Sequence, residues 1–219
     1  MKDNLILAVP AGRISESLGP LLSEVKIAPE SDFDNQLSRK LCFSTCDPGL
    51  NIIRVRSFDV ATFVAFGAAQ LGIAGNDVIM EFDYNEIYVP LDLMMNRCRL
   101  SIAAPIDMDD LRSWSHIRVA TKYPRLTHDY FSARGIQAEC IRLNGAIELA
   151  PKLGLCRRIV DLVQTGRTLH ANGLVELETI LHVTSRLIVN RTAFKTRPVE
   201  IRTWIDRFHS AIQSLPLQS

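Results

Sequence analysis

The sequence predicts an α/β protein whose strands form mostly parallel sheets. Short apolar runs of strand length recur along the chain, and most neighbouring runs are separated by a stretch with the apolar spacing of an amphipathic helix. A helix after each strand returns the chain to the same end of the sheet, so this alternation makes neighbouring strands parallel. No stretch rich in Ser, Gly or Pro separates two halves, so two lobes would have to be joined by crossing strands.

Strands and helices alternate through the first half of the sequence. Residues 12–23 are expected to form a helix because Ile14, Leu18 and Leu21 fall on one face. Asp59 is expected to cap a helix, since its carboxylate can accept hydrogen bonds from the N–H groups of the first turn. The elements expected here are, in order, a strand over 5–9, a helix over 12–23, a strand over 51–56, a helix over 59–66, a strand over 71–74, a helical turn from Asp77 and a strand over 89–93.

The second half continues the alternation. Residues 159–163 form an apolar run interrupted by Asp161, which is typical of a buried parallel strand. The last helix begins at Pro198, which a first helical turn tolerates, and Ile201, Trp204 and Phe208 lie on its apolar stripe. The elements expected before that helix are strands near 99–104, 117–120, 137–141, 159–163, 175–182 and 186–190, with a helix near 127–134.

The composition is that of an ordinary enzyme without a membrane segment. With 25 Lys and Arg against 24 Asp and Glu, the net charge of +1 gives no global field for nucleic acid or anionic lipid, so we expect neither partner. The longest apolar stretch, residues 60–74, is shorter than the ~20 residues that span a bilayer. The first apolar run is too short for a signal peptide, so we expect a cytoplasmic protein.

The cysteines and histidines show no metal-binding or nucleophilic pattern. Five cysteines are an odd number, and no C-x-x-C pair occurs, which argues against a disulfide framework and a zinc site. The five histidines form no i, i+4 pair, so no metal ligands are assigned. His170 can help to neutralise an anion in the adjacent loop, or it is an incidental loop residue.

The most informative segment is the octapeptide Asp161-Leu162-Val163-Gln164-Thr165-Gly166-Arg167-Thr168. Thr165, Gly166 and Thr168 are expected to form a tight turn whose N–H groups and two hydroxyls converge on one anion. The carboxylate of Asp161 would repel a phosphate, so it suits the hydroxyls of a sugar that carries the phosphate, or a metal that bridges to it. The octapeptide therefore predicts a ribose-phosphate site, and an ordinary turn after a strand is the alternative.

The motifs around this loop resemble one enzyme family. Glu148-Leu149-Ala150-Pro151 and Gly154-Leu155 precede the loop, and Asn172-Gly173-Leu174 follows it. In these segments the chain resembles the ATP phosphoribosyltransferase family, the first enzyme of histidine biosynthesis, whose signature runs E-L-A-P, G-L, D-L-V-x-T-G-x-T-L and N-G-L. Further segments that fit the family are residues 5–13, Ser38-Arg39-Lys40-Leu41, and residues 59–81, 98–100, 120–124 and 185–190.

The resemblance implies an architecture and a reaction. The fold would have two α/β lobes like those of type II periplasmic solute-binding proteins, with residues 1–93 and 179–219 in one lobe and residues 94–178 in the other. The reaction would join the adenine N1 of ATP to C1 of 5-phosphoribosyl 1-pyrophosphate and release pyrophosphate, with Mg²⁺ as the cofactor. The chain stops soon after its last expected helix, so we expect the short form of the family.

The resemblance also implies roles for individual residues. Thr165, Gly166, Arg167 and Thr168 would hold the 5-phosphate, and Asp161 and Glu148 the ribose hydroxyls. Arg13 and Arg39 would engage ATP and the departing pyrophosphate, because guanidinium groups match phosphate oxygens bidentately. Lys122 would supply further positive charge to ATP, and Asp77 would either lie near the adenine or cap a helix.

The sequence departs from the family at three places. Ala11 stands where relatives commonly have Lys, and Ala146 where Ser is frequent. Cys156-Arg157-Arg158 replaces a small residue, Asp and a second small residue. None of these departures touches Asp161 or the T-G-x-T core, so the expected reaction stays the same.

The resemblance further implies a partner, and two other functions stay open. Short-form relatives assemble with a regulatory subunit resembling histidyl-tRNA synthetase, so we expect a hetero-oligomer with such a subunit and a homodimer without it. A solute-binding module of the same architecture would need no acid before the phosphate loop. A nucleobase-salvage phosphoribosyltransferase usually has two adjacent acids there, whereas residue 160 is Val.

Overall fold

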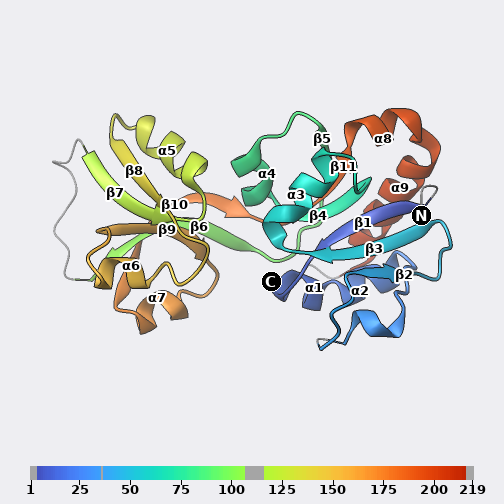
Figure 1. Cartoon of the computed structure of the whole chain (residues 1–219), viewed down its shortest axis with the longest axis horizontal. Helices are drawn as coiled ribbons and strands as arrows, with labels where there is room; N and C mark the ends of the chain where they lie inside the picture. The colour runs from blue at the N-terminus through green and yellow to red at the C-terminus, as the bar shows by residue number, and fades with distance from the viewer. Residues whose placement is uncertain (1–3, 36, 107–115, 216–219) are drawn as a thin grey trace. The chain divides into compact units, whose positions relative to one another are not determined.

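The computed structural model describes residues 4–35, 37–106 and 116–215, without the side chains of Arg13 and Glu16. Its contacts divide the chain into two units, one of residues 1–96 with 184–219 and one of residues 97–183 (Figure 1). The expected lobe boundaries, after residues 93 and 178, lie within five residues of these divisions. The chain crosses twice between the units, so unit 1 is discontinuous in sequence.

Unit 1 contains a six-stranded mixed sheet with the strand order β2-β3-β1-β4-β11-β5. The central strands β3, β1 and β4 are parallel, because helices connect them, and the other neighbours pair antiparallel. The strands are β1 (Leu5–Pro10), β2 (Cys42–Ser44), β3 (Leu50–Val55), β4 (Leu71–Gly75), β5 (Ile87–Asp92) and β11 (Ser185–Asn190).

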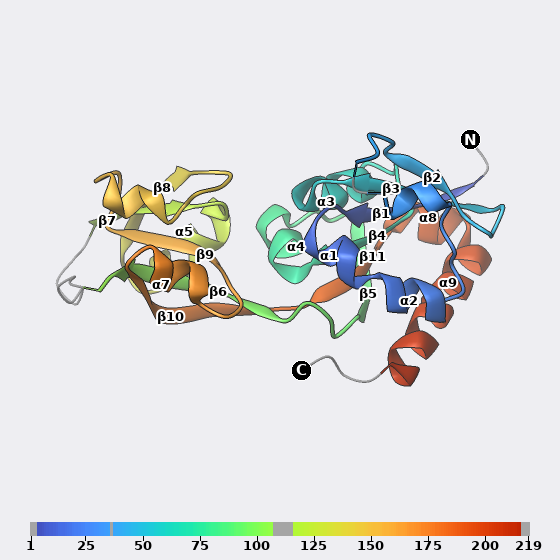
Figure 2. The ribbon, with the colours of Figure 1, turned by 90° about the horizontal axis from the view of Figure 1, so that it is seen from below.

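Helices cover both faces of this sheet. Leu7 and Val9 of β1 point to one face, where α2 and α9 run side by side (Figure 2). Ala8 points to the other face, where it packs against Val60 and Val64 of α3. The helices of unit 1 are α1 (Arg13–Ser17), α2 (Gly19–Glu24), the 3-10 helix η1 (Ser31–Phe33), α3 (Ser57–Ala65), α4 (Asn76–Phe82), α8 (Arg191–Thr196) and α9 (Pro198–Ser214).

Unit 2 contains a five-stranded mixed sheet with the order β10-β6-β9-β7-β8. Strands β9, β7 and β8 are parallel, and β6 is antiparallel to both of its neighbours. The strands are β6 (Cys98–Pro105), β7 (His116–Thr121), β8 (Gln137–Arg142), β9 (Arg158–Val163) and β10 (Leu174–Val183). The helices are α5 (Pro124–Ser132), α6 (Leu149–Lys152) and α7 (Arg167–Ala171).

The predicted α/β class and the order of the expected strands and helices are confirmed, with a difference in the sheets, whereas β2, α6, α7 and α8 were not predicted. The sheets are mixed, and their parallel strands form one block of three in each unit. The strands that carry the chain between the units pair antiparallel with their neighbours, and the alternation of strands and helices does not reveal this. Among the described residues, no helix is long and apolar enough to cross a membrane.

Two local predictions were wrong. The helix expected over 12–23 is interrupted at Leu18, and α2 begins with Gly19 and Pro20. A proline inside a helix lacks the N–H donor and clashes with the preceding turn, whereas it fits in the first turn of a new helix. Asp59 does not cap α3, because the helix begins at Ser57 and its N-cap residue is Arg56. Asp59 instead lies in the first turn, where its negative charge is favourable.

Gly72 allows α3 to pack closely on β4. A Cβ atom at this position would lie 2.8 Å from Cγ2 of Val64, 3.0 Å from Cγ1 of Val60 and 3.1 Å from Cγ1 of Ile188. We predict that Gly72→Ala lowers the free energy of unfolding by about 1–3 kcal/mol, the usual cost of overpacking a core. Chemical denaturation measures this change. Gly19→Ala is the control, because no atom lies within 4 Å of its added Cβ, and equal stability of the two variants would contradict the prediction.

Candidate functional site

The predicted phosphate loop connects the end of β9 to the start of α7. Gln164, Thr165 and Gly166 form the connection, and Gly166 adopts a left-handed conformation with φ of +76° as the N-cap residue of α7. The Oγ1 atom of Thr165 accepts a long hydrogen bond of 3.5 Å from the N–H of Arg167. The loop residues Thr165, Arg167 and Thr168 are exposed, so their polar groups face solvent.

Asp161 lies on the face of the sheet that α7 covers. Side chains two apart in a strand share a face, so Asp161 shares one with Ile159 and Val163, which belong to the same apolar cluster as Leu169 of α7. The Asp161 side chain is half-buried, and its Oδ1 atom accepts a hydrogen bond of 2.8 Å from the N–H of Leu162. The structure therefore brings the predicted carboxylate to the same side of the sheet as the helix that follows the phosphate loop.

Lys122 lies at the same end of the parallel strands. Thr121 of β7 is in register with Val160 of β9, and its buried hydroxyl donates a hydrogen bond of 2.8 Å to the Val160 carbonyl. Lys122 directly follows β7, and Asp161 is the next residue of β9, so both lie beyond this pair toward the carboxyl ends of the strands. In parallel sheets, this end is where ligands bind.

Glu148 belongs to the same unit. It is the N-cap residue of α6, and its side chain is half-buried. The next residue but one, Ala150, packs in the cluster that contains Ile159 and Leu169. The helix that carries Glu148 therefore packs on the face shared by Asp161.

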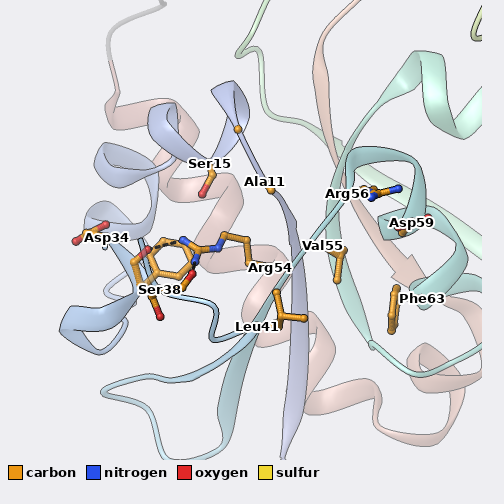
Figure 3. Close-up of a pocket in the computed structure, with 12 residues that line it drawn as sticks. Ala11, Ser15, Asp34, Ser38, Leu41, Arg54, Val55, Arg56, Asp59 and Phe63 are labelled. Atoms are coloured by element: carbon orange, nitrogen blue, oxygen red, sulfur yellow. Dashed lines mark hydrogen bonds between the residues drawn. The ribbon is translucent and has the colours of Figure 1, made fainter. Parts of the chain in front are cut away.

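Unit 1 contains a pocket of about 710 Å³ at the carboxyl ends of β1 and β3 (Figure 3). Ala11 and Gly12 follow β1, and Arg56 follows β3. The S-R-K-L segment contributes Ser38 and Leu41. The full lining comprises Ala11, Gly12, Ser15, Phe33, Asp34, Ser38, Leu41, Arg54, Val55, Arg56, Asp59 and Phe63.

Sequence reasoning missed most polar and aromatic residues of this pocket, among them Arg54, Arg56, Asp59 as a lining residue, and Phe63. The available signal was the position of Arg56 directly after a parallel strand, where functional side chains gather. Phe63 gives the pocket an exposed aromatic surface, because the residue is 37% exposed. A pocket with a guanidinium and an aromatic ring can hold a ligand that is both anionic and planar.

Arg54 anchors the S-R-K-L segment to the sheet. Its Nη1 atom donates a hydrogen bond of 2.9 Å to the Phe33 carbonyl, and Nη2 donates one of 3.4 Å to the Ser38 carbonyl (Figure 3). Its guanidinium carbon lies 5.0 Å from the ring centroid of Phe43 and 5.9 Å from that of Phe33. Arg54 therefore binds the chain itself, and Arg56 is the better candidate for an anion in this pocket.

Two charged groups reinforce the same segment. The Ser38 hydroxyl donates a hydrogen bond of 2.6 Å to Asp32, which lowers the pKa of that carboxyl group. Lys40 forms an ion pair with Glu30, and this hydrogen bond lowers the pKa of Glu30 and raises that of Lys40. The residues on both sides of Arg39, Ser38 and Lys40, are thus held by contacts with Asp32 and Glu30.

The remaining predicted residues of unit 1 have different surroundings. Arg39 is exposed and forms no hydrogen bond or ion pair with any residue that the structure describes. The backbone of Arg13 begins α1, and its side chain is outside the described part of the chain. Asp77 is 3% exposed and is the second residue of α4, so it is not the N-cap. The candidate residues fall into two sets, one in each unit.

Within residues 4–35, 37–106 and 116–215, no group of three or more His, Cys, Asp or Glu side chains can hold a metal ion. Mg²⁺ is commonly bound in proteins through one or two carboxylates together with substrate phosphates and water.

Comparison with known proteins gives concordant results. Residues 56–210, more than half of the chain, match the family model described as HisG: ATP phosphoribosyltransferase. ATP phosphoribosyltransferase from Rhodospirillum rubrum is 61% identical over 216 residues, covering 97% of this chain and 95% of the relative. The protein of the same name from Paramagnetospirillum magneticum is 62% identical over 213 residues, covering 96% of this chain and 97% of the relative.

A solved structure extends the comparison to the fold. A chain of the ATP phosphoribosyl transferase (HisG:HisZ) complex from Thermotoga maritima is 29% identical and superposes with a TM-score of 0.81. The match covers 95% of this chain and 98% of the other.

We predict that Arg54→Met loosens the S-R-K-L segment without unfolding unit 1. Methionine keeps an apolar stem between the rings but loses both hydrogen bonds to carbonyls, each worth about 1.5–3 kcal/mol when the donor is charged. Hydrogen–deuterium exchange should become about tenfold faster or more in peptides that contain Phe33 and Ser38. Arg207→Met is the control, because Arg207 lies over the Trp204 ring at 4.5 Å and contacts no carbonyl of this segment. Unchanged exchange in Arg54→Met would show that the segment is held by other contacts.

Proposed function

The chain belongs to the ATP phosphoribosyltransferase family, and we propose from this premise how its residues serve the first step of histidine biosynthesis. In the proposed reaction, the adenine N1 of ATP attacks C1 of 5-phosphoribosyl 1-pyrophosphate. The N1–C1 bond forms, the bond from C1 to the pyrophosphate oxygen breaks, and pyrophosphate leaves with the bonding electrons. The observation that carries the proposal is the turn from β9 through Gly166 into α7, which displays the family's phosphate-loop motif beside Asp161.

The loop in unit 2 is proposed to bind the phosphoribosyl group. The exposed hydroxyls of Thr165 and Thr168 and the backbone N–H groups around Gly166 would donate hydrogen bonds to the 5-phosphate. Arg167 would add a positive charge. Asp161 and Glu148 would accept hydrogen bonds from the ribose hydroxyls, since carboxylates are strong acceptors.

Catalysis in this proposal depends on positioning and charge. Displacement at a sugar C1 passes through an oxocarbenium-like state, so the reaction needs a fixed ribose and a stabilised leaving group. Arg13, Arg39 and Lys122 would engage the phosphates of ATP and the departing pyrophosphate, as the family resemblance implies, and Arg56 would add a positive charge in the pocket of unit 1. Asp77 would support the adenine side from α4, although its buried position favours a structural contribution.

Mg²⁺ is proposed as the cofactor. It would supply positive charge that stabilises the departing pyrophosphate. Asp161 and Glu148 are the carboxylates that would contribute to its coordination. Loss of turnover on chelation, restored by added Mg²⁺, tests this assignment.

A regulatory partner is also proposed. The structural neighbour is a chain of a complex with a second protein, and the close relatives match this chain over 95% and 97% of their own lengths, as expected for the short form. We expect a cytoplasmic homodimer that joins a histidyl-tRNA-synthetase-like subunit, which would raise activity and carry histidine inhibition. Strong histidine inhibition of this chain alone would contradict the arrangement.

The reaction itself is tested with purified protein, phosphoribosyl pyrophosphate and Mg²⁺. We expect a change of absorbance and release of pyrophosphate with ATP, and neither with free nucleobases. Turnover of a free nucleobase would support the nucleobase-salvage alternative. Binding of phosphoribosyl pyrophosphate and ATP without any product would support a solute-binding module.

Asp161→Asn should keep the fold and weaken use of phosphoribosyl pyrophosphate. The amide keeps the shape of the side chain but replaces a charged acceptor of hydroxyl protons. Hydrogen bonds to a charged group contribute ~1.5–3 kcal/mol, so kcat/KM for this substrate should fall by about ten- to a hundredfold. Steady-state kinetics with a folded variant measure the effect. A kcat/KM of the variant equal to that of the wild type would contradict a role of Asp161 in the site.

Gly166→Ala should abolish most binding of phosphoribosyl pyrophosphate through backbone strain. The position has room for a methyl group, since an added Cβ would lie 3.8 Å from the nearest atom, Cδ2 of His170. The φ of +76° costs an alanine about 1–2 kcal/mol, which favours a shifted loop. Gly154→Ala is a matched control, with φ of +71° in the same unit and an open position for Cβ. Calorimetry should find similar thermal midpoints for both variants and weaker binding only for Gly166→Ala. Equal binding by both variants would contradict the assignment.

A further inference from the structure

We propose that Arg99 is a positioning residue that sets the orientation of the first peptide group of the phosphate loop. This inference rests on the proposed function, because it assigns a role relative to the 5-phosphate of phosphoribosyl pyrophosphate. Arg99 is on β6, outside the loop and its motif. It is in register with Val163, the last residue of β9, so its side chain begins beside the point where the loop departs.

The guanidinium of Arg99 connects three parts of unit 2. Its Nη1 atom donates a hydrogen bond of 3.1 Å to the carbonyl of Gln164, the first loop residue. Its Nε and Nη2 atoms donate bonds of 2.6 and 2.5 Å to the two carboxylate oxygens of Glu176 on β10. The Ser101 hydroxyl donates a further bond of 2.8 Å to Glu176. Both edges of the planar guanidinium are therefore occupied, and its plane is fixed.

This contact determines where a loop N–H group points. The peptide between Gln164 and Thr165 is planar, and in the trans form its C=O and N–H groups point in opposite directions. A Gln164 carbonyl held toward Arg99 therefore directs the Thr165 N–H away from Arg99. Gly166 then turns the chain with its positive φ. The orientation of the backbone N–H groups after this turn therefore depends on the fixed peptide group before it.

The same contacts argue that Arg99 does not bind the phosphate directly. Its donors are shared between Glu176 and Gln164, and Glu176 balances its charge. The hydrogen bond with Arg99 lowers the pKa of Glu176, and the reciprocal bond raises that of Arg99. The pair thus stays ionised over the pH range of ordinary assays, and Arg99 acts on the substrate only through the loop backbone.

Arg99→Lys tests the proposal by kinetics. Lysine keeps the positive charge beside Glu176, but it cannot bond both carboxylate oxygens and the Gln164 carbonyl with one rigid group. We expect the KM for phosphoribosyl pyrophosphate to rise about tenfold or more, as for the loss of a charge-assisted hydrogen bond, while the KM for ATP changes less than twofold. Arg118→Lys is the matched control, because Arg118 pairs with Glu139 between β7 and β8 of the same unit and does not contact the loop.

A second variant and an NMR measurement distinguish the positioning role of Arg99 from a general loss of stability. Glu176→Gln keeps the shape of the acceptor but removes the ion pair, and it should raise the same KM selectively. In ligand-free protein labelled with ¹⁵N-threonine, Arg99→Lys should move the amide resonance of Thr165 more than Arg118→Lys does.

The possible results separate the two proposals. Equal increases in both KM values, or an unmoved Thr165 resonance, would overturn the role of Arg99. Wild-type protein that does not use phosphoribosyl pyrophosphate would instead contradict the proposed function, and the Thr165 resonance would still decide whether Arg99 orients the loop.

Discussion

Strand β9 is held on both edges, by β6 on one side and β7 on the other, and the site in unit 2 depends on this constraint. The backbone pairing and the buried side chains of Ile159 and Val160 leave the strand little freedom to move. The Thr121 hydroxyl adds a buried hydrogen bond to the Val160 carbonyl. The phosphate loop therefore leaves the sheet from a fixed point, which a loop needs if it is to orient several weak donors toward one ligand.

The other end of the phosphate loop, where α7 begins, is also held in place. Leu169 is buried in the cluster that contains Ile159 and Val163, so the short helix α7 is attached to the sheet by packing. Three loop residues then span a short distance between two anchored ends, and the positive φ of Gly166 makes this connection possible. In unit 1 the anchor is a side chain, because Arg54 of β3 donates hydrogen bonds to the carbonyl of Ser38 in the S-R-K-L segment and to that of Phe33 in η1.

Much of the fold could be predicted from local patterns, and the exceptions have identifiable causes. Apolar runs located every strand but β2 to within a few residues, and the octapeptide correctly indicated a strand and a tight turn at Gly166, although Thr168 lies in α7 and not in the turn. The helix over 12–23 was wrong because apolar spacing continues across Gly19-Pro20, where the backbone cannot. The mixed sheets were missed because strand direction depends on pairing partners far apart in sequence, which a periodicity does not encode.

The site was predictable where its residues share a motif and hidden where they come together only in the fold. Asp161 and the loop lie within eight residues, so their chemistry was visible in the sequence. Residues 98–100 fit the family, but Arg99 and Glu176 are 77 residues apart, and only the pairing of β6 with β10 reveals their ion pair. Arg54 and Arg56 were overlooked for a similar reason, because the pocket they line is formed by three separate segments of the chain.

The central claim is that the turn between β9 and α7 binds the 5-phosphate of phosphoribosyl pyrophosphate. A crystal structure of the protein with this substrate tests the claim most directly. The account predicts the 5-phosphate within hydrogen-bond distance of the backbone and hydroxyls of residues 165–168, with the ribose hydroxyls on Asp161. A 5-phosphate seated in the pocket of unit 1, with residues 165–168 free of ligand, would contradict it.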